Sequence, residues 1–86
     1  MKLRPEFITH LTKDEAILVP LGNADFHGIV RGNATLGAIL ELLKQETTEE
    51  QIAEAMCREY DAPKETIAAD VHRVVEQLRG IGAIDG

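Results

Sequence analysis

The spacing of hydrophobic positions changes near residue 34. Before this point, three short runs rich in β-branched and aliphatic residues occupy positions 7–11, 16–21 and 26–31, with turn-forming segments between them. Such runs are typical of antiparallel strands connected by tight turns. Pro20 lacks the N–H that a central ladder position needs, so the second strand is expected to end near Pro20 or to lie at an edge there. The pattern predicts a three-stranded antiparallel sheet.

After residue 34, apolar residues recur every three to four positions, which is the period of an amphipathic helix. The first helical stripe comprises Leu36, Ile39, Leu40 and Leu43. Asn33 precedes this stripe, and its side-chain oxygen can accept a hydrogen bond from the N–H of Thr35 or Leu36, as a helix N-cap does. We therefore expect a first helix that begins after Asn33.

A second helix is expected to begin at the segment "TTEEQ". Either Thr47 with Glu50 or Thr48 with Gln51 gives a capping-box pattern there, and the two alternatives cannot be separated by spacing alone. The apolar face of this helix continues through Ile52, Met56 and Tyr60. The segment "DAP" is expected to end it.

A third helix is expected to follow from Pro63, because the missing N–H of proline is tolerated at the first helical position. Gly80 and Gly82 are expected to break this helix, and the last residues are expected to form a short tail. Its apolar stripe is the most regular in the chain and comprises Ile67, Val71, Val74, Val75 and Leu78.

Three strands followed by three helices with short connections indicate an α+β fold. The apolar faces of the helices are expected to cover one face of the sheet, in a winged helix-turn-helix-like arrangement. A chain of 86 residues is long enough for one small core and too short for two, so we expect a single domain over residues 1–86.

The charge balance restricts the possible partners. Nine Lys and Arg residues against fifteen Asp and Glu residues give a formal net charge of −6, which repels the phosphate backbone of nucleic acids. No apolar stretch approaches the length of a membrane span, and no secretory signal follows Met1. The lone Cys57 has no partner for an internal disulfide. We expect a cytoplasmic protein that binds neither nucleic acid nor membranes.

Gly32 and Gly37 have the spacing of the glycines in a phosphate-binding P-loop. That motif also needs a Lys and then a Ser or Thr after the second glycine, but Ala38 and Ile39 stand there instead. Gly37 is also expected to fall inside the first helix, since Leu36 already belongs to its apolar stripe. The motif therefore does not predict nucleotide binding.

No other constellation of residues indicates catalysis. His10, His27 and His72 do not have the spacing of metal ligands, and no His or Asn lies near Cys57 in sequence to activate its thiol. The acidic residues at the start of the second helix favour the positive end of its dipole and are interpreted as solvated charges; they are Glu49, Glu50 and Glu54. We expect no enzyme activity, no metal and no cofactor.

The third predicted strand is the best candidate for an open sheet edge that could accept an added peptide strand. Residues 26–31 contain no proline, Gly28 permits close approach of another backbone, and Arg31 could meet an acidic peptide side chain. A flank of the third helix carries Asp70, Arg73 and Gln77. An edge strand without a ligand and a helix with solvated charges explain these features equally well.

The segment from Ala24 to Asp85 resembles the PqqD-like family, which is named for a small protein of pyrroloquinoline quinone biosynthesis. The shared features, in order, are a strand, the "N-x-T" helix start at Asn33 and Thr35, and the segments "ELL", "TTEEQI" and "EYD". They continue with "DV" at Asp70 and a final "L-x-x-x-G" from Leu78 to Gly82. No single feature is specific, but together they cover about three quarters of the chain.

The resemblance implies a non-catalytic element that binds the leader of a ribosomally made precursor peptide. The leader would add a strand beside the third strand, against the third helix, and be presented to a modifying enzyme, often a radical S-adenosylmethionine protein. Carried over to this chain, the peptide-binding residues would be His27, Gly28, Ile29, Val30 and Arg31, with Asp70, Arg73, Val74 and Gln77 from the helix. Family members often have a Leu before the capping Asn and an aromatic residue in the first helix, where this chain has Gly32 and Leu40.

Two other functions are compatible with the predicted fold. Three helices beside a small sheet are also the architecture of winged-helix DNA-binding proteins, although the net charge of −6 disfavours that function. A free sheet edge can also pair with its own copy, which would make the chain a structural homodimer.

Overall fold

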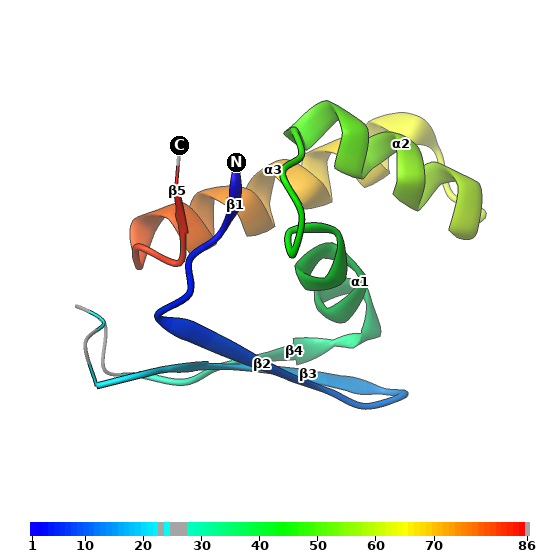
Figure 1. Ribbon diagram of the computed structural model, residues 1–86. Coiled ribbons are helices and arrows are strands. Elements are labelled where there is room, and N and C mark those ends of the chain that lie inside the picture. The colour runs from blue at the N-terminus through cyan, green and yellow to red at the C-terminus, as the bar shows by residue number, and fades with distance from the viewer. Residues whose placement is uncertain (23, 25–27, 86) are drawn as a thin grey trace.

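The computed structural model describes residues 1–22, 24 and 28–85. Three helices lie on one side of an antiparallel sheet of strand order β2-β3-β4, and the short strands β1 and β5 form a separate pair (Figure 1). The elements are β1 (Lys2–Leu3), β2 (Phe7–Leu11), β3 (Glu15–Pro20), β4 (Val30–Asn33), α1 (Ala34–Leu42), α2 (Glu49–Glu59), α3 (Lys64–Gly80) and β5 (Ile84–Asp85). The predicted α+β class, with a three-stranded antiparallel sheet followed by three helices, is confirmed.

The central strand of the sheet is β3, and its two faces have different surroundings. Ala16 and Leu18 are fully buried beneath the helices, whereas Ile17 and Val19 are only partly buried. Side chains alternate between the faces of a strand, so Ile17 and Val19 lie on the face without helices. The strand ends at Pro20, as predicted from the missing N–H of proline.

The third strand does not have the predicted bounds. It begins at Val30 and extends to Asn33, whereas the prediction was residues 26–31. Gly28 and Ile29 lie outside the strand, and Phe26 and His27 lie outside the described residues. The register with β3, from Leu18 opposite Val30 to Glu15 opposite Asn33, sets these limits. Gly32 and Asn33 resemble turn and cap residues in the sequence, but pairing with β3 extends their backbone.

Helix α1 begins as predicted. The Asn33 side-chain oxygen accepts a hydrogen bond from the Leu36 N–H at 3.2 Å, and the stripe of Leu36, Ile39 and Leu40 is buried. Gly37 lies inside this helix and is buried, so the Gly32–Gly37 spacing does not form a phosphate loop.

Helix α2 uses the second of the two capping alternatives. The Thr48 hydroxyl oxygen accepts a hydrogen bond from the Gln51 N–H at 3.1 Å. Ile52 and Met56 are buried as expected, but Tyr60 is exposed and caps the helix C-terminus, so it does not continue the apolar face. The Tyr60 backbone is extended, with φ of −117° and ψ of 138°, so its side chain no longer follows the helical period of Ile52 and Met56.

Helix α3 has the predicted apolar stripe, and all five of its residues are buried. Pro63 directly precedes the helix and does not form its first residue. Gly80 still belongs to the helix, and the break comes at Gly82, whose φ of 76° is strained for residues with a side chain. The N–H groups of Gly82 and Ala83 close the last turn by donating to the carbonyls of Arg79 and Leu78.

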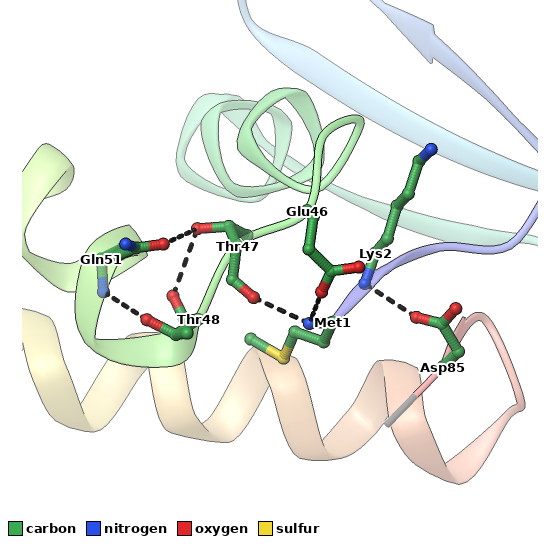
Figure 2. Close-up of polar contacts among 7 residues, drawn as sticks. All are labelled: Met1, Lys2, Glu46, Thr47, Thr48, Gln51 and Asp85. Atoms are coloured by element: carbon green, nitrogen blue, oxygen red, sulfur yellow. Dashed lines mark hydrogen bonds and ion pairs between the residues drawn. The ribbon is translucent and has the colours of Figure 1, made fainter.

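The two ends of the chain meet in a sheet that the sequence did not predict. Leu3 pairs with Ile84 and Lys2 with Asp85, so the expected tail is a strand, β5, and its Ile84 is buried. Figure 2 shows the Lys2 N–H donating to the Asp85 carboxylate at 2.9 Å. In the same view, the Met1 amino group forms an ion pair with Glu46 and donates to the Thr47 carbonyl.

The helices do not all cover the sheet, which is a further difference from the prediction. Helix α1 packs against β3 and β4, while α2 packs mainly against α3 (Figure 1). One core joins these layers, from Phe7 and Leu18 in the sheet to Ile52 and Val75 in the outer helices. In Figure 1, α1 lies between the sheet and the layer formed by α2 and α3, and a flank of α3 borders the region of β4.

Candidate functional site

Strand β4 is an edge of the three-stranded sheet. It pairs with β3 on one side, and in the described part of the chain no strand pairs with its other side. The N–H and C=O groups that point away from β3 are therefore available to another backbone. The prediction that the third strand is a sheet edge is confirmed.

A groove of about 670 Å³ lies between β4 and helix α3. One wall is formed by residues 29–33 and the start of α1, and the other by the C-terminal part of α3. Its apolar surface includes Leu36, Val74 and Leu78, which are nearly buried and also belong to the core. Ile29 lies at the groove with 61% of its surface exposed, so the groove offers an apolar side chain that the fold itself does not cover.

The structure brings most of the predicted site residues together at this groove. Seven of them line it: Ile29, Val30, Arg31, Asp70, Arg73, Val74 and Gln77. Gly28 is half-buried and is not part of the lining, and His27 lies outside the described residues. The role of these residues in binding a peptide stays a prediction.

Several lining residues were not predicted as site residues. They are Gly32, Asn33, Thr35, Leu36, Leu78, Gly80 and Ile81. Leu36 and Leu78 were correctly assigned to apolar helix faces, but an amphipathic stripe does not reveal which of its members lies at the rim of the core. Gly80 was expected to help end the helix, Ile81 was given no role, and no sequence signal connects a helix end to a groove.

Gly32 has a specific steric role beside the groove. A Cβ atom at this position would lie 2.4 Å from Leu36 Cδ2 and 2.9 Å from Leu36 Cβ. The Leu36 side chain therefore occupies the space that a side chain at position 32 would need. The resemblance implies that family members often have a Leu before the capping Asn, and in this chain the Leu36 side chain of α1 lies against that position.

The charged residues at the groove are two arginines and one aspartate. The Arg73 guanidinium lies 3.8 Å from the Asp70 carboxylate, one turn away on α3, and both side chains are more than half exposed. Arg31, on β4, makes no ion pair with another residue that the structure describes. The groove thus carries a local net charge of +1 in a chain whose formal net charge is −6.

Outside the groove, the predicted polar residues form ordinary surface contacts. His72 Nδ1 lies 3.1 Å from the Glu49 carboxylate, which joins α3 to the first turn of α2. Within residues 1–22, 24 and 28–85, no three His, Cys, Asp or Glu side chains are grouped so that they could hold a metal ion. None of the helices described is long and apolar enough to cross a membrane.

The fold and the groove define a class of protein: a small winged-helix-like α+β domain with an open strand edge beside a helix. Residues 15–84 match the family described as Coenzyme PQQ synthesis protein D (PqqD), and the chain belongs to this family. The resemblance inferred from the sequence is confirmed. A search of curated protein sequences found no match.

Two solved structures have a similar fold. One is TbiB1 in complex with the TbiA(beta) leader peptide, with a TM-score of 0.83 and 23% identity over 100% of this chain and 96% of that chain. Another is lasso peptide synthetase B1 complexed with the leader peptide, with a TM-score of 0.72 and 20% identity over 92% of this chain and 89% of that chain. Both similarities support the winged-helix-like fold.

Proposed function

We propose that the chain is a non-catalytic peptide-recognition domain. It binds the leader of a ribosomally made precursor peptide and presents that peptide to a modifying enzyme of the radical S-adenosylmethionine or another class. The observation that carries this proposal is the groove between the open edge of β4 and helix α3. Membership of the PqqD family and two similar folds whose structures contain leader peptides support it.

The proposed mode of binding is strand addition. A peptide in extended conformation pairs with the open side of β4, and its main-chain hydrogen bonds supply affinity without dependence on sequence. Alternate peptide side chains then enter the groove and contact the apolar surface of Leu36, Val74 and Leu78. Their burial supplies both further affinity and selectivity for apolar residues at those positions.

The proposed contact residues remain those named from the sequence, with three additions. The set comprises His27, Gly28, Ile29, Val30, Arg31, Asp70, Arg73, Val74 and Gln77, together with Gly32, Leu36 and Leu78 from the groove lining. The chain holds and orients the peptide as a single domain, and the partner enzyme supplies the chemistry. Binding takes place in the cytoplasm, where ribosomes make the precursor.

Amide chemical-shift mapping tests the site. The labelled chain is titrated with the synthetic leader of a precursor peptide encoded beside its gene. Perturbations are expected in residues 29–33 and along the C-terminal part of α3, because both walls of the groove contact the added strand. Perturbations confined to α2, or no perturbations at a saturating concentration of leader, would contradict the proposal.

Val30→Pro tests whether the peptide adds as a strand. Proline removes the Val30 N–H and restricts the β4 backbone, so we expect the leader affinity to fall by about tenfold or more. Isothermal titration calorimetry measures the affinity, and Val30→Ile serves as control because it keeps the N–H and the β-branched apolar shape. Thermal unfolding monitored by circular dichroism establishes that both variants are folded.

N-methylation of the leader gives the same test without altering the fold. Methyl groups on alternate peptide nitrogens remove only the donors that face β4, or only those that face away from it. Methylation of the nitrogens that face β4 is expected to abolish binding, and methylation of the nitrogens that face away from β4 is expected to preserve most of it. Equal losses of affinity for the two methylated leaders would contradict strand addition.

A further inference from the structure

The position of Arg31 suggests a preference for one class of peptide. Arg31 is opposite Ile17 in the β3–β4 register, while its neighbours Val30 and Gly32 are opposite the buried residues Leu18 and Ala16. Side chains alternate along a strand, so Val30 and Gly32 face the helices and Arg31 faces the other side of the sheet. Arg31 also belongs to the groove lining at the open edge.

A strand added to β4 would have the same alternation. Peptide residues aligned with Val30 and Gly32 would face α3 and the apolar groove surface. Peptide residues aligned with Arg31 would face the side without helices, where a cross-strand neighbour lies within reach of the guanidinium. The two faces of the peptide therefore meet different chemistry.

Among the residues that the structure describes, Arg31 is the cation at the groove that has no ion-pair partner. Arg73 has the Asp70 carboxylate 3.8 Å away, so a peptide carboxylate at Arg73 would compete with an existing partner and approach an existing negative charge. Arg31 has no ion-pair partner in the part of the chain that the structure describes. A carboxylate beside Arg31 gains a charge-assisted hydrogen bond without displacing another anion.

We propose that the groove selects peptide strands in which an acidic residue alternates with apolar residues, with the acidic side chain beside Arg31 and the apolar side chains against α3. This inference rests on the proposed strand addition. It assigns Arg31 as the residue that determines specificity for the outward side of the peptide, while Leu36, Val74 and Leu78 select the inward side.

The net charge of the chain and the charge of Arg31 have opposite effects on the binding of an acidic peptide, so their contributions can be separated by experiment. A chain with a formal net charge of −6 attracts a basic peptide and repels an acidic one at long range. The interaction at Arg31 acts only at short range and favours the acidic peptide. A preference for the acidic peptide can therefore be assigned to a local contact and not to the overall charge.

The experiment uses a fluorescein-labelled eight-residue peptide that alternates valine with threonine and carries Glu, Gln or Lys at one central threonine position. Fluorescence anisotropy at low ionic strength measures the three affinities. The Glu peptide is expected to bind about twofold to fivefold more tightly than the Gln peptide, as for a cross-strand pair of opposite charge. The Lys peptide is expected to bind most weakly. Moving Glu to a central valine position should weaken binding, because the carboxylate then faces the apolar groove.

Arg31→Glu provides the reciprocal test, with Arg58→Glu as the matched control. Arg58 is exposed near the end of α2 and outside the groove lining, so its variant changes the net charge equally without changing the site. Arg31→Glu is expected to invert the order of the Glu and Lys peptides, and Arg58→Glu to preserve it. Equal affinities for all three peptides, or the same inversion in both variants, would overturn this inference and leave the proposed function intact. No binding of any of the three peptides would also overturn this inference, whereas the proposed function is overturned only if the leader itself fails to bind in the chemical-shift titration.

Discussion

Gly32 and Gly37 differ in what their missing side chains allow. At Gly37 a Cβ atom would lie 3.5 Å from the Ala16 Cβ, an ordinary van der Waals distance, where α1 packs on β3. At Gly32 the nearest atoms belong to Leu36, and a Cβ atom would overlap them. The sequence motif that the two glycines share thus has no common structural role: one lies in a helix packed on the sheet, and the other leaves space for a leucine at the groove.

Gly37→Ala is expected to stabilise the protein. Alanine is favoured over glycine in a helix interior by about 1 kcal/mol, and the added methyl group fits against Ala16 without displacing it. Urea denaturation should show a free energy of unfolding higher by up to ~1 kcal/mol. Gly37→Val is the comparison: its larger side chain should overpack the α1–β3 contact and lower the stability.

Gly32→Ala is expected to have the opposite effect. The new methyl group overlaps the Leu36 side chain, including its Cβ, which cannot move without a shift of α1. We expect a loss of roughly 1–3 kcal/mol in the free energy of unfolding, as for overpacked sites. Combining it with Leu36→Ala should recover part of the Gly32→Ala loss in a double-mutant cycle, and strict additivity of the two changes would contradict this account.

Strands β1 and β5 show how short elements contribute when they are held by tertiary contacts. Each has only two residues, which is too short to be stable alone. The Leu3 N–H donates to the Leu43 carbonyl, directly after α1, and the Arg4 N–H donates to the Ala83 carbonyl, between α3 and β5. These hydrogen bonds connect the pair to the C-terminal ends of both helices. The pair covers the core where α3 ends, and the Ile84 side chain of β5 is buried in that core.

Ile84→Ala measures that contribution. Ile84 is 2% exposed, so truncation removes buried methyl groups and leaves a cavity beside α3. Thermal and urea unfolding should show a loss of about 2–5 kcal/mol. Lys2→Ala, in the partner strand, is the control: its side chain is exposed and its backbone hydrogen bond remains, so its effect should stay within about 0.5 kcal/mol. Similar losses for both variants would contradict a buried role for β5.

At the scale of the whole molecule, the charge distribution argues against the winged-helix DNA-binding alternative. Helix α3, the candidate recognition helix of that architecture, carries three acidic residues (Glu65, Asp70 and Glu76) and three basic residues (Lys64, Arg73 and Arg79). Arg73 and Arg79 pair with the acidic residues one turn earlier. A helix whose charges balance cannot supply the excess of cations that nucleic-acid binding requires.

We therefore expect no binding to duplex DNA. An electrophoretic mobility shift assay at low ionic strength, where phosphate contacts are strongest, should show no retarded band at micromolar protein. A basic winged-helix protein of known activity serves as the positive control. Retardation that weakens steeply as salt is added would revive the DNA-binding alternative.

The amino-acid sequence by itself determined the class of fold and the limits of the elements that have local signals. The apolar stripe from Ile67 to Leu78 and the cap at Asn33 depend on neighbouring residues, so spacing and side-chain chemistry were enough to predict them. The two capping alternatives at Thr47 and Thr48 were separated only by the structure, because both offer the same hydroxyl group.

Tertiary structure alone decided the features that depend on distant residues. The register with β3 extends β4 through Gly32 and Asn33, and β5 is a strand only because Leu3 lies beside it. The groove arises where the flank of α3 faces the edge of β4, and Leu36 supplies the apolar side chain that position 32 lacks. Contacts between residues far apart in the chain leave no periodic pattern in either partner, so the pattern of residues alone did not join the strand and the helix into one surface. Only the resemblance to the PqqD-like family placed residues of both at a common groove.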